Sequence, residues 1–412
     1  MHNKQIVKGP IDTNKMSRWL GFLLAICLGL VPINKFASGG FQVVDPFMVA
    51  LIVVAFYLPP LGQPLKKLVL SLLPFIIWSN IINLGYFAFS GTIHNIKLSF
   101  NMAYVFFMLY AFTKVFREVF DSGGIFYVYL GLFISLITVF TVRGWYEWEG
   151  ARFSYSFNNP NQLALYCLLV LLMVILLLQY KIEMNIRNKL YFTFDAMVIV
   201  ILHYLALQAI SRSGLSAIVV ADIYLLKKMF SKKLFVPISL SISIGVSLLL
   251  LLNPTFIQDR LAARNPDSFG KGAFQSRVES MIIKPMQSFT GIKILIGTGM
   301  HYAEKEGFLR EMFKEDDFEV HSMFGHVLWA YGIIGLALYL YWVVTAIVKG
   351  WILPDTKWVW AAILTYSVGG VVIRFRSYWI LLGLILALVI LKTSLSKENT
   401  FANKPLVDNR TP

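Results

Sequence analysis

The sequence contains few charged residues and almost no cysteine. Asp, Glu, Lys and Arg make up 14% of its 412 residues, whereas soluble domains carry about a quarter. Hydrophobic residues make up 57% of the chain and its mean hydropathy is +0.67. A water-soluble core could not enclose so many apolar side chains in a chain of this length, which excludes a soluble enzyme or binding domain. We predict an all-α, polytopic membrane protein.

The only two cysteines, Cys27 and Cys167, do not form the pattern of a disulfide framework or a metal knuckle. Both lie within apolar runs, and we interpret them as buried core thiols. The sequence also lacks an HExxH motif, a DxD-type carboxylate pair and a cysteine cluster in its predicted outer loops. We therefore predict no metal site and no cofactor.

Twelve segments have the roughly 20 mostly apolar residues that a membrane-spanning helix needs. They are approximately 17–33, 45–61, 68–88, 97–116, 123–142, 161–180, 191–210, 213–229, 234–252, 322–347, 357–373 and 377–392. The eighth segment is the weakest, because its apolar core ends at Lys227. It spans the membrane only if the lysines there extend to the interface.

These segments divide the chain into four parts. Residues 1–252 contain the first nine spans, 253–320 form one large loop, 321–392 contain the last three spans, and 393–412 form a polar tail that we predict to be disordered. The loop is predicted to be partly helical, because apolar residues recur at helical spacing in 273–287 and 302–318. A loop of this length in a compact protein is usually functional.

The distribution of basic residues predicts the orientation. The termini and alternate connections carry 21 Lys and Arg against 7 Asp and Glu, whereas the opposite face carries 16 against 13. By the positive-inside rule the first face is cytoplasmic, so both termini lie inside and the loop 253–320 lies outside. The net charge of +15 is thus mostly a consequence of topology, and nucleic-acid binding is not needed to explain it.

Arginine is concentrated on the predicted outer face, which holds 9 arginines against 4 on the cytoplasmic face. A guanidinium binds phosphate through a planar fork of donors, which lysine lacks. Several outer arginines lie in short connections beside the ends of spans: Arg143, Arg212, Arg374 and Arg376. Anchoring at lipid headgroups is the alternative role for each one. Together they indicate an anionic ligand on the outer face.

The connection Ser211-Arg212-Ser213-Gly214 joins the seventh and eighth spans. We expect Arg212 to lie beside the positive end of the following helix, Ser213 to cap that helix, and Gly214 to let a ligand approach the backbone. This combination suits a diphosphate group. A tight turn with an anchoring arginine explains the residues equally well.

His321 closes the large loop and precedes the tenth span. At the membrane face a histidine can act as a general base near neutral pH, although a histidine at a helix start is as often structural. His326 follows five residues later, so the two rings do not share a helical face and do not make a metal site.

Aromatic residues are dense in the predicted outer loop 143–160. Trp145, Trp148 and Tyr155 are possible sugar contacts, with an interfacial aromatic belt as the alternative. Within the predicted spans, Asp195 and Asp222 are expected to pair with Lys189 or Lys227. We expect His203 to be a hydrogen-bonded packing residue.

The order of these features resembles the O-antigen ligase and O-antigen polymerase family of bacterial glycan assembly. The matching stretches are FNNPNQLALY before the sixth span, AISRSGLSA at the turn between the seventh and eighth spans, the large loop with its arginines, and HSMFGHVLWAYGIIGLALYL at the close of that loop. The resemblance covers approximately residues 150–350. The first four spans are similar only in hydropathy.

The resemblance implies a metal-independent, inverting glycosyltransferase of lipopolysaccharide or other polysaccharide biosynthesis. Its donor would be a glycan on a polyprenyl (undecaprenyl) diphosphate, and its acceptor a glycan or a lipid A core at the outer face of the bacterial cytoplasmic (inner) membrane. Arg212 matches the family's turn arginine, Arg277 its loop arginine and His321 its loop-closing histidine. Ser322 departs from the asparagine that often follows this histidine.

Two functional questions stay open at the level of sequence. The residues do not distinguish a ligase from a polymerase, nor do they identify the sugars. The alternative function is a transporter or flippase of lipid-linked glycans. Polar residues gathered on one side of the membrane favour the transferase.

Overall fold

The computed structural model describes residues 13–33, 42–91, 93–142, 154–157, 159–209, 211–230, 291–299, 322–350 and 356–402. Every regular element in these ranges is a helix. The helices are α1 (Thr13–Leu30), α2 (Asp45–Tyr57), α3 (Gln63–Leu70), α4 (Leu73–Ser90), α5 (Ile93–Asp121), α6 (Ile125–Thr141), α7 (Pro160–Glu183), α8 (Lys189–Ala209), α9 (Arg212–Phe230), α14 (Lys293–Ile296), α17 (Met323–Gly350), α18 (Thr356–Gly369) and α19 (Arg376–Ala402).

Six helical stretches are long and apolar enough to cross a membrane: Lys66–Ser90, Asn95–Asp121, Pro160–Glu183, Lys189–Ala209, Met323–Val348 and Arg376–Thr393. Three shorter apolar helices accompany them. Large apolar side chains such as Trp19, Phe56 and Phe100 are exposed on the surface, as expected for contact with lipid. The described residues are thus all-α, as predicted, and six of their helical stretches are candidate membrane spans.

Each predicted span outside 234–252 coincides with a described helix or helix pair. The ninth span, 234–252, lies outside the described residues, and the number of crossings stays a prediction. The third span is divided, because α3 ends at Leu70 and α4 begins at Leu73. α19 continues to Ala402, so the first part of the tail predicted to be disordered is helical.

The helix α7 lies at the centre of the bundle, where 89% of its apolar window is buried. It begins at Pro160, a residue favoured in the first helical turn, and the Asn159 side chain caps it by accepting from the Gln162 amide at 2.9 Å. Cys167 on α7 and Cys27 on α1 are both buried and free, which confirms that they are core thiols. Helices α8, α9 and α19 pack around α7.

A buried ion pair joins α7 to α8. The Lys181 ammonium contacts the Asp195 carboxylate, and neither side chain is more than 2% exposed. The Tyr129 hydroxyl on α6 donates to Asp195 at 2.8 Å. The predicted pairing of Asp195 with Lys189 is wrong. The chain reverses direction between α7 and α8, which places Lys181 of α7 beside Asp195 of α8.

The second intramembrane aspartate pairs with a histidine. The His203 ring on α8 lies 2.7 Å from the Ile199 carbonyl oxygen through Nδ1 and 3.0 Å from the Asp222 carboxylate on α9 through Nε2. The prediction of a hydrogen-bonded His203 is confirmed. The predicted pairing of Asp222 with Lys227 is replaced by this contact between neighbouring helices.

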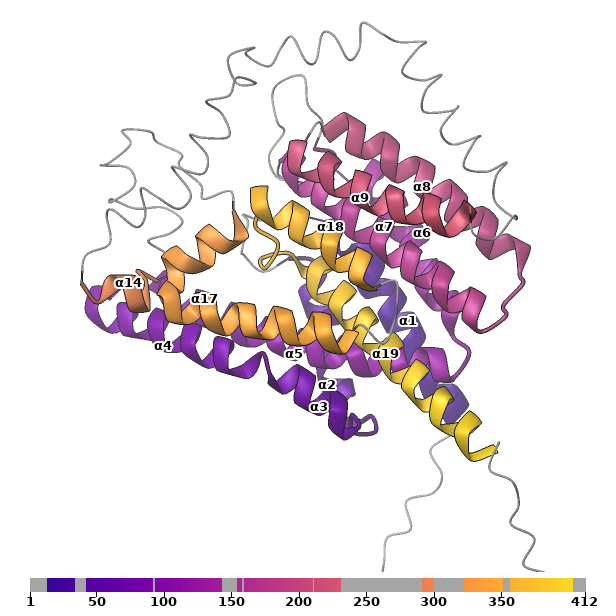
Figure 1. The fold of residues 1–412 in the computed structure, drawn as a ribbon, viewed down its shortest axis with the longest axis horizontal. Coiled ribbons are helices and arrows are strands. Elements are labelled where there is room, and N and C mark those ends of the chain that lie inside the picture. Colours follow the sequence, from indigo (N-terminus) through magenta and orange to yellow (C-terminus); the bar gives the residue numbers. More distant parts are fainter. Residues whose placement is uncertain are drawn as a thin grey trace, which may run out of the picture.

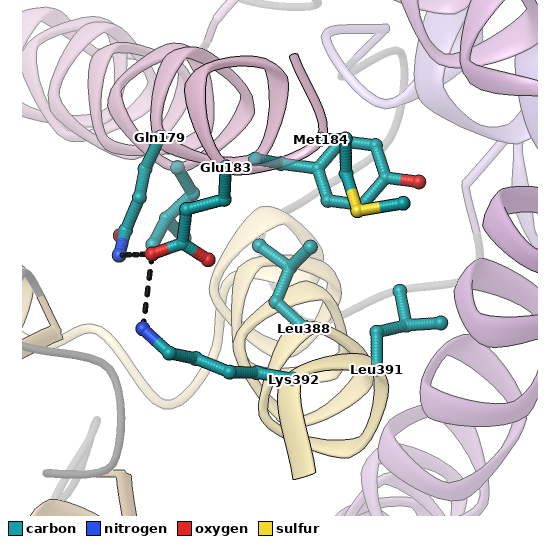
Figure 2. Close-up of a pocket in the computed structure, with 8 residues that line it drawn as sticks. Gln179, Glu183, Met184, Leu388, Leu391 and Lys392 are labelled. Carbon is teal, nitrogen blue, oxygen red and sulfur yellow. Dashed lines mark hydrogen bonds and ion pairs between the residues drawn. The ribbon is translucent and has the colours of Figure 1, made fainter. Parts of the chain in front are cut away.

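Two further contacts fix helix ends. Lys114 lies within α5, and its ammonium donates to the Leu58 carbonyl at 2.7 Å, just beyond the end of α2. At the end of α7, the Glu183 carboxylate accepts from Gln179 and from Lys392 of α19, each at 3.0 Å (Figure 2). These contacts hold the end of α7 against α19 beside a small pocket.

The Lys181 pair yields a stability prediction. We expect Lys181→Met to lower the free energy of unfolding by about 3–5 kcal/mol, because it leaves a buried carboxylate without its cation. Adding Asp195→Asn should recover most of this loss, since the amide still accepts from Tyr129. Thermal unfolding in detergent, followed by size-exclusion chromatography, measures both. An unchanged melting temperature in Lys181→Met would contradict the buried pair.

Candidate functional site

Five helices begin at the same end of the bundle, which we call the arginine end: α2, α7, α9, α17 and α19. Direct contacts bring their first turns together. Arg376, the first residue of α19, pairs with Asp45, the first residue of α2. Arg374, two residues before α19, contacts His326 in the first turn of α17. Helix starts carry partial positive charge from their unpaired amides, so five of them together favour an anion.

α7 and α9 are joined to this end through α18. The Tyr366 hydroxyl near the end of α18 donates to the Asn161 carbonyl at the start of α7 at 3.1 Å. The Ser213 hydroxyl at the start of α9 donates to the Gly369 carbonyl at 3.0 Å. The turn from α18 to α19, which carries Arg374, therefore lies beside the first turns of both helices.

The start of α9 differs in detail from the prediction. Ser211, and not Ser213, provides the capping oxygen, which accepts from the Gly214 amide at 3.4 Å. A Cβ atom on Gly214 would lie 2.6 Å from the Ala164 side chain, so this glycine serves close packing against α7 and leaves no space for a ligand. Arg212 is the first residue of α9, and its side chain lies outside the described residues.

Arg376 is held by an internal ion pair. Its Nε and Nη2 atoms each lie 2.6 Å from an oxygen of Asp45, whose side chain is buried. The Tyr104 hydroxyl of α5 and the Gln42 amide also donate to this carboxylate, at 2.9 and 2.5 Å. Arg376, predicted as a possible secondary anion contact, thus fastens α19 to α2 and α5.

Arg374 has a different partner. Its Nη2 atom lies 3.2 Å from Nε2 and 3.3 Å from Nδ1 of His326, a buried residue in the first turns of α17. A guanidinium only donates, so the imidazole accepts through an unprotonated nitrogen and contributes no negative charge. The turn itself is fixed by Trp379, whose indole donates to the Ile373 carbonyl at 2.8 Å.

The role of His326 was missed at the level of sequence. The sequence indicates only that His326 and His321 do not make a metal site. Its true contact lies 48 residues away, across two helices. Only its position on the buried side of the first turns of α17 could have indicated an internal partner.

Helix α17 is broken at Gly332, where φ is 68° and ψ is −171°. Figure 1 shows its two arms meeting at a sharp bend beside α14. The carbonyls of the three residues before the break accept hydrogen bonds from elsewhere. Trp329 accepts from the Thr298 amide and Ala330 from the Gly299 amide, both at 2.9 Å, and Tyr331 accepts from the Trp78 indole at 3.0 Å.

Two glycines allow this close approach. A Cβ atom on Gly332 would lie 2.2 Å from the Leu295 carbonyl oxygen, and one on Gly297 would lie 2.5 Å from the Ala330 backbone. Both residues have positive φ, which a side chain disfavours. The glycines of GTG at 297–299 and of GIIG at 332–335 therefore lie on two sides of one contact. This contact fixes the described segment 291–299 of the predicted large loop against α17.

Most of the other predicted site residues fall outside the described part of the chain. These are Arg143, Trp145, Trp148, Arg277 and His321. Ser322, which follows His321, is described: its hydroxyl accepts from the Gly325 amide at 3.4 Å and caps α17. Tyr155, a possible sugar contact, lies edge-on to Phe140 with ring centroids 5.6 Å apart and packs against the core.

Comparison with models of known protein families gives no match, and no curated protein sequence matches the chain.

The Arg376 pair yields a second stability prediction. Arg376→Lys keeps the charge but loses the two-point contact with Asp45. We expect it to lower the free energy of unfolding by about 1–3 kcal/mol, as for the loss of a hydrogen bond to a charged group. The matched control is Arg117→Lys, whose exposed pair with Asp121 should contribute less than about 1 kcal/mol. Equal melting temperatures for the two variants would show that the Asp45 contact does not hold α19.

Proposed function

We propose that this protein is an integral-membrane glycosyltransferase. It would transfer a glycan from a polyprenyl diphosphate to an acceptor hydroxyl at the outer face of the bacterial cytoplasmic membrane, as a ligase or a polymerase. The observation that carries the proposal is the convergence of five helix starts and the Arg374 turn at one end of the bundle. Such an arrangement favours an anionic group beside the membrane surface, where the diphosphate of a lipid-linked donor would lie.

The proposed topology agrees with the direction of the helices. In a chain of twelve spans with both termini in the cytoplasm, the even-numbered spans begin outside. The five helices that begin at the arginine end correspond to predicted spans 2, 6, 8, 10 and 12. The arginine end would therefore face outward, below the loop 253–320, as required for a donor already carried across the membrane.

In the proposed reaction the donor enters laterally from the bilayer. Arg212 and Arg277 bind its diphosphate, and Arg374 and Arg143 are further anion contacts. The acceptor oxygen attacks the anomeric carbon from the side opposite the phosphate, which inverts that carbon. The bond to the diphosphate breaks, and polyprenyl diphosphate leaves with the electron pair. Fixed cations in a site of low dielectric stabilise this developing charge.

His321 would accept the proton of the attacking hydroxyl. It directly precedes Ser322, the capping residue of α17, so its backbone is attached to a membrane helix. The competing histidine of the predicted loop is His301, which follows Gly299, whose amide is bonded to the Ala330 carbonyl of α17. Trp145, Trp148 and Tyr155 stay possible sugar contacts in this proposal. No cofactor is required, because the activated donor supplies the driving force.

A transporter or flippase is the second candidate, and the broken helix favours it. Interrupted helices form the substrate sites of many transporters. However, the freed carbonyls at Gly332 are bonded within the protein, and the interior charges of Lys181 and Asp195 neutralise one another. A proteoliposome assay separates the two functions. A transferase forms a glycosidic bond between donor and acceptor, whereas a flippase moves the donor and forms none.

His321 carries the third prediction. We expect His321→Ala to lower the transfer rate by about 10²–10⁴, the usual contribution of a general base, with donor binding retained. His301→Ala is the matched control and should lower it far less. Both rates are measured with purified protein in liposomes. Turnover in His321→Ala above about a tenth of the wild-type rate would rule out this role.

Arg212 carries the fourth prediction. Arg212→Lys should lose nearly as much activity as Arg212→Ala, because lysine does not reproduce the two-point contact with phosphate. Arg143→Lys is the control and should retain activity. Transfer rate and binding of the lipid-linked donor are measured for each variant. Full activity in Arg212→Lys would mean that the residue only anchors the helix at the interface.

A further inference from the structure

Two buried polar side chains on α5 have unused hydrogen-bonding groups. Asn95 is 1% exposed and Ser99 is 5% exposed. Neither the amide oxygen nor the amide nitrogen of Asn95, nor the hydroxyl of Ser99, has a hydrogen-bond partner in the described part of the chain. The two residues lie four positions apart, so they share one face of the helix. Buried polar groups are nearly always satisfied, which points to a missing partner.

The Ser99 hydroxyl differs from three other buried hydroxyls on helices. Each of these bonds to a carbonyl of its own helix: Thr113 of α5 to Leu109, Ser79 of α4 to Ile76 and Ser367 of α18 to Ile363, at 2.7–2.9 Å. Ser99 has the same backbone carbonyls within reach but does not use them. Its hydroxyl is thus directed elsewhere, as is the whole Asn95 amide.

The pair lies beyond the start of α19, on the side of the arginine end. α5 and α19 run in the same direction: Tyr104 meets the Asp45 carboxylate that binds Arg376, and Gly383 packs on Phe112. Counting back from Tyr104 at about 1.5 Å per residue, Ser99 lies about 7 Å and Asn95 about 13 Å further out along the axis. The first turns of α5 therefore extend past the level of Arg376.

We propose that Asn95 and Ser99 bind hydroxyl groups of the donor glycan, in a sugar subsite next to the diphosphate site at the arginine end. This inference rests on the proposed function. An amide and a hydroxyl each donate and accept, as sugar hydroxyls do, and neither carries a charge. The pair therefore suits the neutral sugar attached to the diphosphate and does not suit the diphosphate itself.

The test compares two lipid probes in the absence of acceptor: undecaprenyl diphosphate, and undecaprenyl diphosphate carrying one N-acetylglucosamine. Wild-type protein in nanodiscs should bind the sugar-bearing probe more tightly. The double variant Asn95→Leu with Ser99→Ala should weaken binding of the sugar-bearing probe by about tenfold or more, as expected for the loss of two or three neutral hydrogen bonds. Its affinity for the bare diphosphate probe should be unchanged. Arg374→Gln should weaken both probes alike.

Thermal stability provides a second readout. The double variant should unfold at the same temperature as wild type or higher, because apolar side chains replace unsatisfied buried groups. Thr113→Val, which removes a satisfied hydroxyl from the same helix, is the control and should leave the preference for the sugar-bearing probe intact. A change in preference with no loss of stability separates binding from folding.

Three results would overturn the inference. Equal binding of the two probes by wild type, or an unchanged preference in the double variant, would show that Asn95 and Ser99 hold only ordered water. The diphosphate site would survive either result. If wild type binds neither probe, the proposed function fails, and the sugar subsite fails with it.

Discussion

Inside a bilayer a backbone amide or carbonyl has no water to bond, so the protein itself must satisfy each one. This constraint explains why every regular element in the described residues is a helix. It also explains why the break in α17 lies where it does. The carbonyls freed before Gly332 accept from Thr298, Gly299 and the Trp78 indole, so a segment of the large loop completes a membrane helix. The segment 291–299 and the broken helix α17 are thus one structural unit.

The same requirement governs charge. The buried ammonium of Lys181 contacts Asp195, and the Arg376 guanidinium contacts Asp45. Removing a charge from water is costly, and only a partner with good geometry offsets the cost. Arg374 stands apart in that one of its contacts is a neutral imidazole, which orients the guanidinium without opposing its charge.

Periodicity and hydropathy alone predicted the helices well, because the length of an apolar run is set by the bilayer and needs no knowledge of tertiary contacts. The partners of polar side chains could not be predicted this way. Asp195 pairs with Lys181 and not with Lys189 because the α7–α8 turn sets the pairing. The same holds for Ser213, which bonds to Gly369 across 156 positions of sequence. His326 and Arg374 were each noticed, but their contact depends on how α17 and α18 pack.

A sequence motif therefore has a different value in a membrane protein than in a soluble one. Gly214 was predicted to let a ligand approach the backbone, yet Ala164 of α7 fills the space beside it, and Leu295 fills the space beside Gly332 in the same way. Glycine here reports close packing of helices. The polar groups that depart from internal satisfaction are the better indicators of a ligand. In the described residues of α5, these are Ser99 and Asn95, which lie about 7 and 13 Å beyond the level of Arg376 along the helix axis. Their position on the side of the arginine end, together with their unmet hydrogen bonding, is what supports the sugar subsite proposed there.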